Sequence, residues 1–136
     1  MKNNASAVWN GSGKEGSGKL STKSKVLDNV TYSYKSRFEG DNHTNPEELI
    51  AAAHSGCFAM KLSFLLDAAG FSDKTLNVNC EVDFVAGVVK SSTISVRARV
   101  PGISNETFQE LLQDAAKNCP ISQLLNTEIT AAGSLE

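Results

Sequence analysis

The chain has 136 residues, which predicts one domain, residues 1–136, able to bury a core without a disulfide or structural metal. A formal net charge of −2 and the lack of a dense basic run argue against nucleic acid or an anionic membrane as a partner. No apolar stretch follows Met1, so no secretory signal is expected. The polar residues inside the apolar segment Leu49–Ala69 argue against a membrane span, and a cytoplasmic location, where thiols stay reduced, is the default expectation.

Short segments of alternating hydrophobicity fill the first part of the chain. Strands are expected over Ala5–Trp9, Leu20–Ser24 and Val30–Phe38, with a glycine-rich flexible turn over Asn10–Gly18. These segments predict an N-terminal meander. Arg37 falls at the end of the third strand, where a lone arginine is usually a solvated surface residue.

A long helix is expected next, because its start carries several signals. Asn45 suits the N-cap, Pro46 the first helical position, and Glu48 the position of a capping-box partner. Glu47 complements the positive end of the helix dipole, and Gly70 can cap the far end. The helix is apolar nearly all round, so it should be buried on several sides, with a dimer partner as a source of additional cover.

Two amphipathic strands follow the long helix. Leu76–Phe84 and Ile94–Val100 both alternate, and we expect a hairpin joined through a loop over Ala86–Ser92. A second helix should begin with Ser104 or Asn105 as its cap.

The second helix breaks at Asn118-Cys119-Pro120, and a short helical turn and a strand around Glu128–Ala131 are expected after it. Because proline favours the first position of a helix, Cys119 should lie at a helix N-terminus, a setting that favours a thiolate. A buried, unreactive cysteine at a helix break is an equally good interpretation. The expected fold class is α+β, with antiparallel sheets, a long buried central helix and a second helix.

The other two cysteines differ in their surroundings. Cys80 falls on the apolar face of its strand, where a cysteine usually fills the core. Cys57 lies in the middle of the long helix, with His54 three residues before it on the same face, so the histidine could serve as a base or an ion-pair partner. The alternative is a helix that packs closely through its small residues, Ala53, Gly56 and Ala59.

Neither a phosphate loop nor a metal site is expected. Gly13–Lys19 has phosphate-loop spacing, but Leu20 stands where a hydroxyl should bind magnesium. The candidate zinc ligands are His43, His54, Cys57 and Cys119, but they lack the paired spacing of a zinc site. No cofactor is therefore expected.

Two runs of residues resemble a known family. Arg37-Phe38-Glu39-Gly40 together with Thr44–Met60, which contains His54-Ser55-Gly56-Cys57, resembles the first motif of the osmotically inducible protein C family. Asn118-Cys119-Pro120-Ile121-Ser122 resembles its second cysteine motif, and the likeness covers nearly the whole chain. The sister group of organic hydroperoxide resistance proteins shares the two-cysteine plan.

The resemblance implies a thiol peroxidase that works as an intertwined homodimer with two active sites at the subunit interface. By motif, Cys57 would attack the peroxide, Cys119 would resolve the product, and Arg37 and Glu47 would form a charged pair supporting Cys57. The loop at Ala86–Ser92 is short beside typical members, which would alter the pocket rim or the dimer contacts.

The implied partners are an organic hydroperoxide, with hydrogen peroxide as a further candidate substrate, and an external dithiol reductant, for which a lipoyl-bearing protein is a candidate. The apolar neighbours Phe58 and Met60 suggest a pocket for an organic substrate. A dimeric binding protein for a small apolar ligand, with cysteines that are merely packed, is the alternative function.

Two questions stay open. Helix-end reasoning favours Cys119 as the more acidic thiol, whereas the resemblance favours Cys57. We follow the resemblance, because a neighbouring arginine can shift the pKa of a thiol more than a helix end can. Glu47 and Cys57 are ten residues apart, or roughly 15 Å along a helix at ~1.5 Å per residue. If Glu47 supports Cys57, it should therefore come from the partner's helix.

Overall fold

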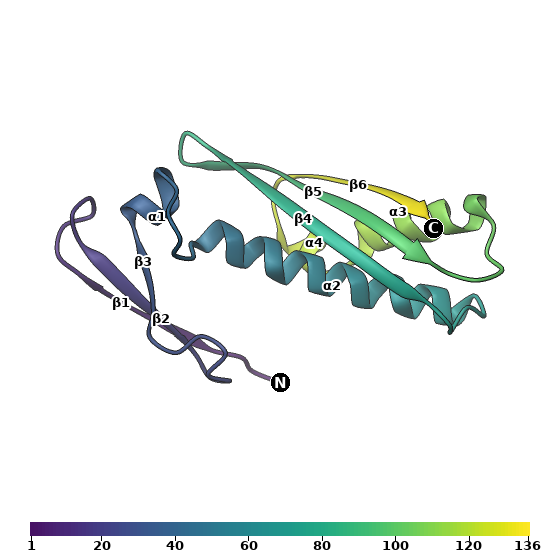
Figure 1. Cartoon of the computed structure of the whole chain (residues 1–136), viewed down its shortest axis with the longest axis horizontal. Helices are drawn as coiled ribbons and strands as arrows, with labels where there is room; N and C mark the ends of the chain where they lie inside the picture. The colour runs from purple at the N-terminus through teal and green to yellow at the C-terminus, as the bar shows by residue number, and fades with distance from the viewer. The chain divides into compact units, whose positions relative to one another are not determined.

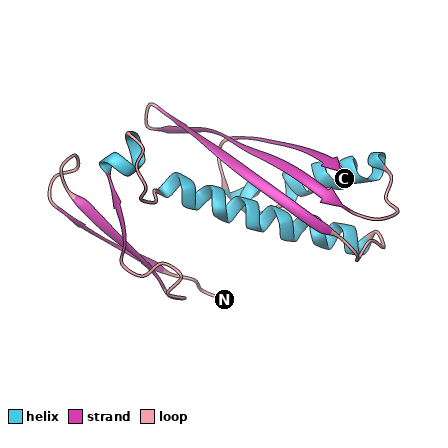
Figure 2. Ribbon diagram, viewed as in Figure 1, coloured by secondary structure: helices cyan, strands magenta, loops and turns pink.

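The computed structural model describes residues 1–136 as six strands and four helices (Figures 1 and 2). The chain folds into two compact units, Met1–Leu49 and Ile50–Glu136. The α+β class is as expected, and the assignment of both units to one domain stays a prediction. In chain order, the elements are β1 (Ala5–Asn10), β2 (Ser17–Thr22), β3 (Val30–Ser33), α1 (Tyr34–Phe38), α2 (Pro46–Ala68), β4 (Thr75–Val85), β5 (Val88–Arg99), α3 (Asn105–Asn118), α4 (Pro120–Leu124) and β6 (Glu128–Leu135).

The first unit contains the expected meander, an antiparallel sheet in the order β1-β2-β3. Gly18 on β2 lies between Trp9 on β1 and Tyr32 on β3, and the two rings approach to a centroid distance of 5.4 Å. A Cβ at Gly18 would overlap the Tyr32 ring and lie 2.8 Å from the Trp9 ring. Glycine is therefore required here for the aromatic contact across the sheet.

The expected strand over Val30–Phe38 was wrong in its second half, because Tyr34–Phe38 forms the helix α1. The Ser33 Oγ accepts a hydrogen bond from the Ser36 amide at 3.2 Å, and the Ser36 Oγ accepts one from the Ser33 amide at 2.8 Å. These short side chains satisfy backbone donors locally and so compete with strand pairing. Arg37 consequently lies on a helix and not at a strand end.

The start and end of α2 were predicted correctly. The Asn45 Oδ1 accepts a hydrogen bond from the Glu48 amide at 2.8 Å, and Gly70 follows the helix with a φ of 93°. The capping box is not reciprocal, because the Glu48 carboxylate accepts from the Thr44 hydroxyl at 2.9 Å instead.

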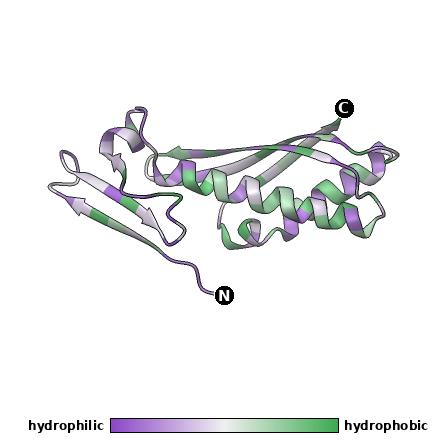
Figure 3. Cartoon of the chain, turned by 60° about the horizontal axis from the view of Figure 1, so that its bottom comes forward, coloured by the Kyte–Doolittle hydropathy of each residue, from purple (hydrophilic) through white to green (hydrophobic).

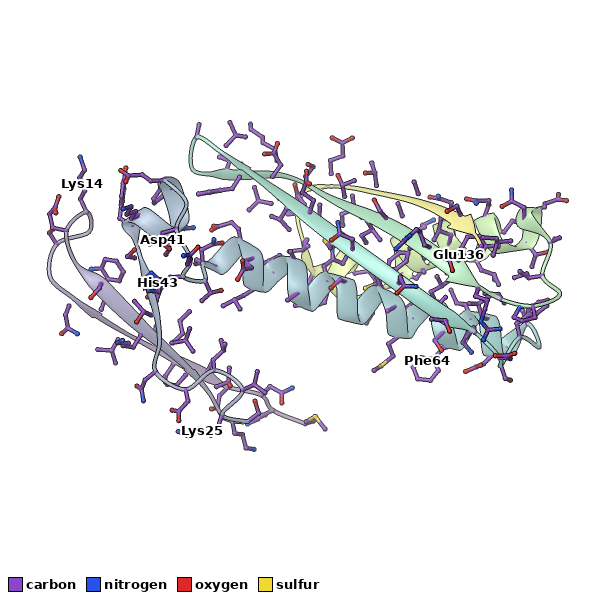
Figure 4. All side chains as sticks on the ribbon, viewed as in Figure 1. Lys14, Lys25, Asp41, His43, Phe64 and Glu136 are labelled. Atoms are coloured by element: carbon purple, nitrogen blue, oxygen red, sulfur yellow. The ribbon has the colours of Figure 1, made fainter.

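Within the chain, the long helix is buried on one face only; the expected burial of its other sides by a dimer partner stays a prediction. Met60 and Phe64 are each 63% exposed, and Phe64 projects from α2 away from the sheet of the second unit (Figure 4). Only 22% of the helix's most apolar 18-residue stretch is buried. The buried face is a single row of side chains, each 0% exposed: His54, Phe58, Leu62 and Leu66.

By length and composition alone, α2 is apolar enough to cross a membrane, so the expectation that its polar residues argue against a span stays a prediction. Hydrophobic residues recur along the whole helix (Figure 3). The buried row of α2 belongs to the hydrophobic core of the second unit, together with Ile94, Val96 and Phe108. Core helices of folded domains have this composition as well.

The second unit is built on a sheet in the order β4-β5-β6. β4 and β5 pair antiparallel as predicted, whereas β5 and β6 pair parallel, so the expectation of purely antiparallel sheets was wrong. A parallel partner requires a crossover, and α3 and α4 provide it. Along β5, buried residues alternate with exposed ones, so the core lies on one face of the sheet: Ser92, Ile94, Val96 and Ala98 are the buried set.

The hairpin between β4 and β5 is tighter than predicted. Ala86 and Gly87 alone form the turn, with φ angles of 52° and 80°, and Val88 already belongs to β5. Two consecutive positive φ angles match the two-residue turn that suits the twist of paired strands. Most of the expected loop over Ala86–Ser92 is therefore strand, and Ser92 is fully buried.

The break after the second helix was predicted correctly. Ser104 caps α3 by accepting from the Thr107 amide at 3.2 Å. Cys119 leaves the helical conformation, with φ −60° and ψ 131°, and Pro120 begins α4.

We predict that Gly18→Ala destabilises the first unit by about 1–3 kcal/mol, because the added methyl group must displace an aromatic ring. The matched control is Gly13→Ala, where a Cβ meets nothing within 4 Å. Urea unfolding can be followed through Trp9, the only tryptophan of the chain. Equal midpoints for the two variants would contradict the packing described for Gly18.

Candidate active site

Two cysteines from distant parts of the sequence meet in the second unit. The Cys119 thiol donates to the Cys57 Sγ across a sulfur–sulfur distance of 3.0 Å, although 62 residues separate them in the chain. Cys57 is in the middle of α2, and Cys119 is the residue between α3 and α4. The sulfurs are about 1 Å further apart than the ~2.05 Å of a disulfide bond, so a small shift would join them.

The two thiols differ in exposure. Cys119 is 0% exposed, whereas Cys57 is half-buried. A dissolved oxidant can therefore reach Cys57 more easily than Cys119. This difference favours Cys57 as the attacking thiol, against the helix-end argument made for Cys119.

The surroundings of Cys57 in the second unit do not favour its thiolate. Burial raises the pKa of Cys57, and contact with the Cys119 thiol raises it further. A hydrogen bond from the backbone amide of Ile121 lowers the pKa of Cys57 but does not outweigh these effects. A reactive thiolate at Cys57 thus requires a positive charge from elsewhere.

His54 does not provide that charge, because its ring is engaged on both sides. The Nδ1 atom is 2.7 Å from the Ser92 Oγ on β5, and the Nε2 atom is 2.7 Å from the Ser122 Oγ on α4. Burial lowers the pKa of His54, so the ring is neutral near pH 7. The hypothesis that His54 acts as a base or ion-pair partner for Cys57 therefore has no support in this geometry. The alternative was that small residues let the helix pack closely, but a Cβ at Gly56 would meet nothing within 4 Å in this chain.

Cys80 lies beside this histidine. Its Sγ is 3.1 Å from the Ser92 Oγ and 3.8 Å from the His54 Nδ1, and the side chain is half-buried against the core. Burial raises the pKa of Cys80, although the hydrogen bond with Ser92 lowers it. Cys80 therefore behaves as a neutral, packed thiol.

Sequence reasoning missed the roles of Ser92 and Ser122. Ser122 lies within the second cysteine motif, but the motif alone indicates no partner for its hydroxyl. Ser92 falls in register with the buried residues of β5, so a polar residue there indicates a buried hydrogen bond. That signal was hidden because the residue was assigned to a loop.

The candidate charged pair is formed within the first unit. The Arg37 Nη2 donates to the Glu47 Oε1 at 2.7 Å, and the Arg37 Nε donates to the two carboxylate oxygens at 3.1 and 3.2 Å. Glu47 is 8% exposed, and its hydrogen bonds raise the pKa of Arg37. Such forked, charge-assisted pairing holds a guanidinium firmly. Cys57 belongs to the other unit, so the support of Cys57 by this pair stays a proposal.

No group of three or more histidine, cysteine, aspartate or glutamate side chains is placed to hold a metal ion. His43 lies in the first unit beside Asp41, with 3.2 Å between its Nδ1 and the Asp41 Oδ2 (Figure 4). His54 and the two facing cysteines belong to the second unit.

Comparisons with known proteins agree with the motifs. A family model described as OsmC-like protein matches residues 39–132. Peroxiredoxin OsmC of Escherichia coli (strain K12) is 43% identical over 128 residues, covering 91% of this chain and 90% of the relative. Organic hydroperoxide resistance protein-like 2 of Staphylococcus epidermidis is 29% identical over 92 residues, covering 62% of each chain.

Solved structures share the fold. An OsmC-like protein of unknown function from Vibrio cholerae has a TM-score of 0.71 at 14% identity, covering 98% of this chain and 99% of the other. The organic hydroperoxide resistance protein OhrB of Bacillus subtilis has a TM-score of 0.61 at 23% identity, covering 98% of each chain. With a family model that matches over most of its length and a relative 43% identical across nine-tenths of it, the chain belongs to the OsmC-like protein family.

Proposed function

We propose that this protein is a two-cysteine peroxidase that reduces organic hydroperoxides in defence against oxidative stress. The observation that carries the proposal is the 3.0 Å contact between a half-buried thiol, Cys57, and a fully buried one, Cys119. The names of the relatives, peroxiredoxin and organic hydroperoxide resistance protein, support the same class of reaction.

The proposed cycle has three steps, namely oxidation of Cys57, formation of a disulfide and reduction of that disulfide. The Cys57 thiolate attacks one peroxide oxygen, the O–O bond breaks, and the alkoxide takes a proton to leave as an alcohol. The resulting Cys57 sulfenic acid reacts with the Cys119 thiol, forming a disulfide and releasing water. An external dithiol then reduces the disulfide by exchange and is itself oxidised to a disulfide.

The fully buried Cys119 is suited to the second step only. It is shielded from bulk oxidant but already faces the sulfur on which the sulfenic acid forms. Its closeness shortens the life of the sulfenic acid and so protects Cys57 from further oxidation.

The substrate is an organic hydroperoxide, with hydrogen peroxide as a second candidate, and the reductant is a dithiol for which a lipoyl-bearing protein is a candidate. The expected role of Phe58 in an apolar pocket was wrong, since Phe58 is 0% exposed in the core. Met60 is exposed and remains a candidate contact. We place the protein in the cytoplasm, where dithiol reductants are maintained.

We also propose that the working form is an intertwined homodimer. One side of α2 is apolar and open, with Met60 and Phe64 each 63% exposed, and exposed apolar patches of this kind mark interaction sites. A second copy of the chain would cover this side.

In such a dimer, the partner's Arg37–Glu47 pair would supply the positive charge that Cys57 needs. Glu47 is the second residue of α2 and Cys57 follows ten residues later, roughly 15 Å along a helix at ~1.5 Å per residue. A pair tied to Glu47 is thus too far along the same helix, whereas the partner's helix can bring it close. Beside the Arg37 guanidinium, the Cys57 thiolate would be stabilised.

The alternative function is a dimeric protein that binds a small apolar ligand and whose cysteines are only packed. The open apolar side of α2, with Met60 and Phe64 exposed, is a surface that such a ligand could contact. Peroxide-dependent loss of two thiols per chain distinguishes the two, because a binding protein would keep its thiols. Cumene hydroperoxide with a thiol reagent is a suitable assay.

We predict a division of labour between the thiols. Cys57→Ser should abolish turnover, whereas Cys119→Ser should consume about one peroxide per subunit and then stall as a sulfenic acid or overoxidise. Cys80→Ala is the matched control and should retain activity. If Cys119→Ser is inert and Cys57→Ser reacts, the two roles are reversed.

We further predict complementation between Glu47→Gln and Cys57→Ser subunits. If the charged pair acts from the partner, a mixed dimer keeps one site with both groups intact, and its peroxidase activity exceeds that of either parent. Exchange of subunits is checked by native mass spectrometry. Exchanged dimers without any gain in activity would contradict the arrangement.

A further inference from the structure

A fully buried histidine joins three elements of the second unit. His54 occupies the same row of α2 as Phe58, Leu62 and Leu66, all 0% exposed, so a hydrophobic residue would suit the position equally well. Burying an imidazole is costly unless both nitrogens find partners. Both do, in Ser92 on β5 and Ser122 on α4, at 2.7 Å each.

The bond to Ser122 lies next to the thiol pair. Cys57 follows His54 by three residues on α2, and Ser122 follows Cys119 by three residues at α4. One turn of α2 and the start of α4 are therefore connected twice, through the two sulfurs and through the imidazole and hydroxyl. The backbone amide of Ile121, which lies between Cys119 and Ser122 in the sequence, is hydrogen-bonded to Cys57.

The helix α4 needs such a connection. It has five residues, Pro120–Leu124, and follows directly on the break at Cys119. A helix of this length is not stable by itself and takes its position from its contacts. Leu124 is 74% exposed and adds little packing, whereas Ile121 packs against the core and Ser122 is 7% exposed and bonded to His54.

We propose that His54 is a positioning residue for the resolving step: through Ser122 it holds α4, and with it the Cys119 thiol, opposite Cys57. Cys119 ends α3 and caps α4, so a shift of α4 moves its sulfur directly. The neutral ring donates from one nitrogen and accepts at the other, which the two serine hydroxyls can match in either tautomer. The inference rests on the proposed two-cysteine reaction.

The test separates the two chemical steps. Reduced protein is mixed with cumene hydroperoxide in a quenched-flow instrument, and intact mass spectrometry then follows the sulfenic acid, the disulfide and the sulfinic acid over time. Ser122→Ala removes the bond to α4 and should slow disulfide formation about fivefold, the effect of losing one buried hydrogen bond, with little change in the rate of sulfenic acid formation. More sulfinic acid should accumulate than in the wild type.

Two further variants exclude a merely structural effect. Ser92→Ala removes the other bond of the same ring, on the sheet side, and should slow disulfide formation less than Ser122→Ala does, because the bond to α4 remains. Ser122→Thr keeps a hydroxyl and should restore it. Thermal unfolding of each variant shows whether its fold is retained.

Three results would overturn the inference. Disulfide formation in Ser122→Ala at the wild-type rate would do so, as would equal slowing in Ser92→Ala, or a stably folded Ser122→Thr without recovery. A wild-type protein that consumes peroxide without forming a disulfide would overturn the proposed function as well, whereas normal wild-type cycling with unaffected variants would refute only the role of His54.

Discussion

The proposed chemistry of this protein depends on the approach of the Cys119 Sγ to within 3.0 Å of the Cys57 Sγ. The approach exists because the chain stops being helical at Cys119, where an extended conformation ends α3 and Pro120 starts α4 in a new direction. If α3 continued through Cys119 without this break, the residues of α4 would extend along the axis of α3 and would not turn in a new direction. The turn of α4 that follows is then held by His54 through Ser122. The fold of the second unit thus brings the two thiols side by side.

A pair of facing thiols does not make a reactive one. Burial raises the pKa of Cys57, so the second unit alone favours the neutral thiol, which is a poor nucleophile. In the proposed site, the positive charge that would reverse this preference is that of Arg37, which forms a forked hydrogen-bond pair with Glu47 in the first unit. In the proposed dimer, the reactivity of Cys57 would depend on assembly, because the partner's guanidinium would stabilise the thiolate. The apolar side of α2, where Met60 and Phe64 are exposed, is the surface that a second subunit would cover in the proposed dimer.

Much of this arrangement could be predicted from local patterns. The alternation of β4 and β5, the cap at Asn45 and the break at Cys119 are each fixed by a few neighbouring residues, and all three are present. The errors arose where a pattern was ambiguous or the interaction was not local. Val30–Phe38 alternates like a strand, yet Ser33 and Ser36 bond each other's backbone and start a helix. The parallel pairing of β5 with β6 depends on a crossover that no local pattern reveals.

The candidate site was predictable to the same extent. Cys57 and Cys119 were found through their motifs, whereas the hydrogen bonds of His54 to two serines depend on tertiary contacts between residues 38 and 68 positions apart.

The most direct test of the proposed two-cysteine reaction is peptide mapping of the wild-type protein after one equivalent of an organic hydroperoxide. We expect a single disulfide between Cys57 and Cys119 and a free thiol at Cys80. A disulfide through Cys80, or peroxide consumption that leaves all three thiols free, would contradict it.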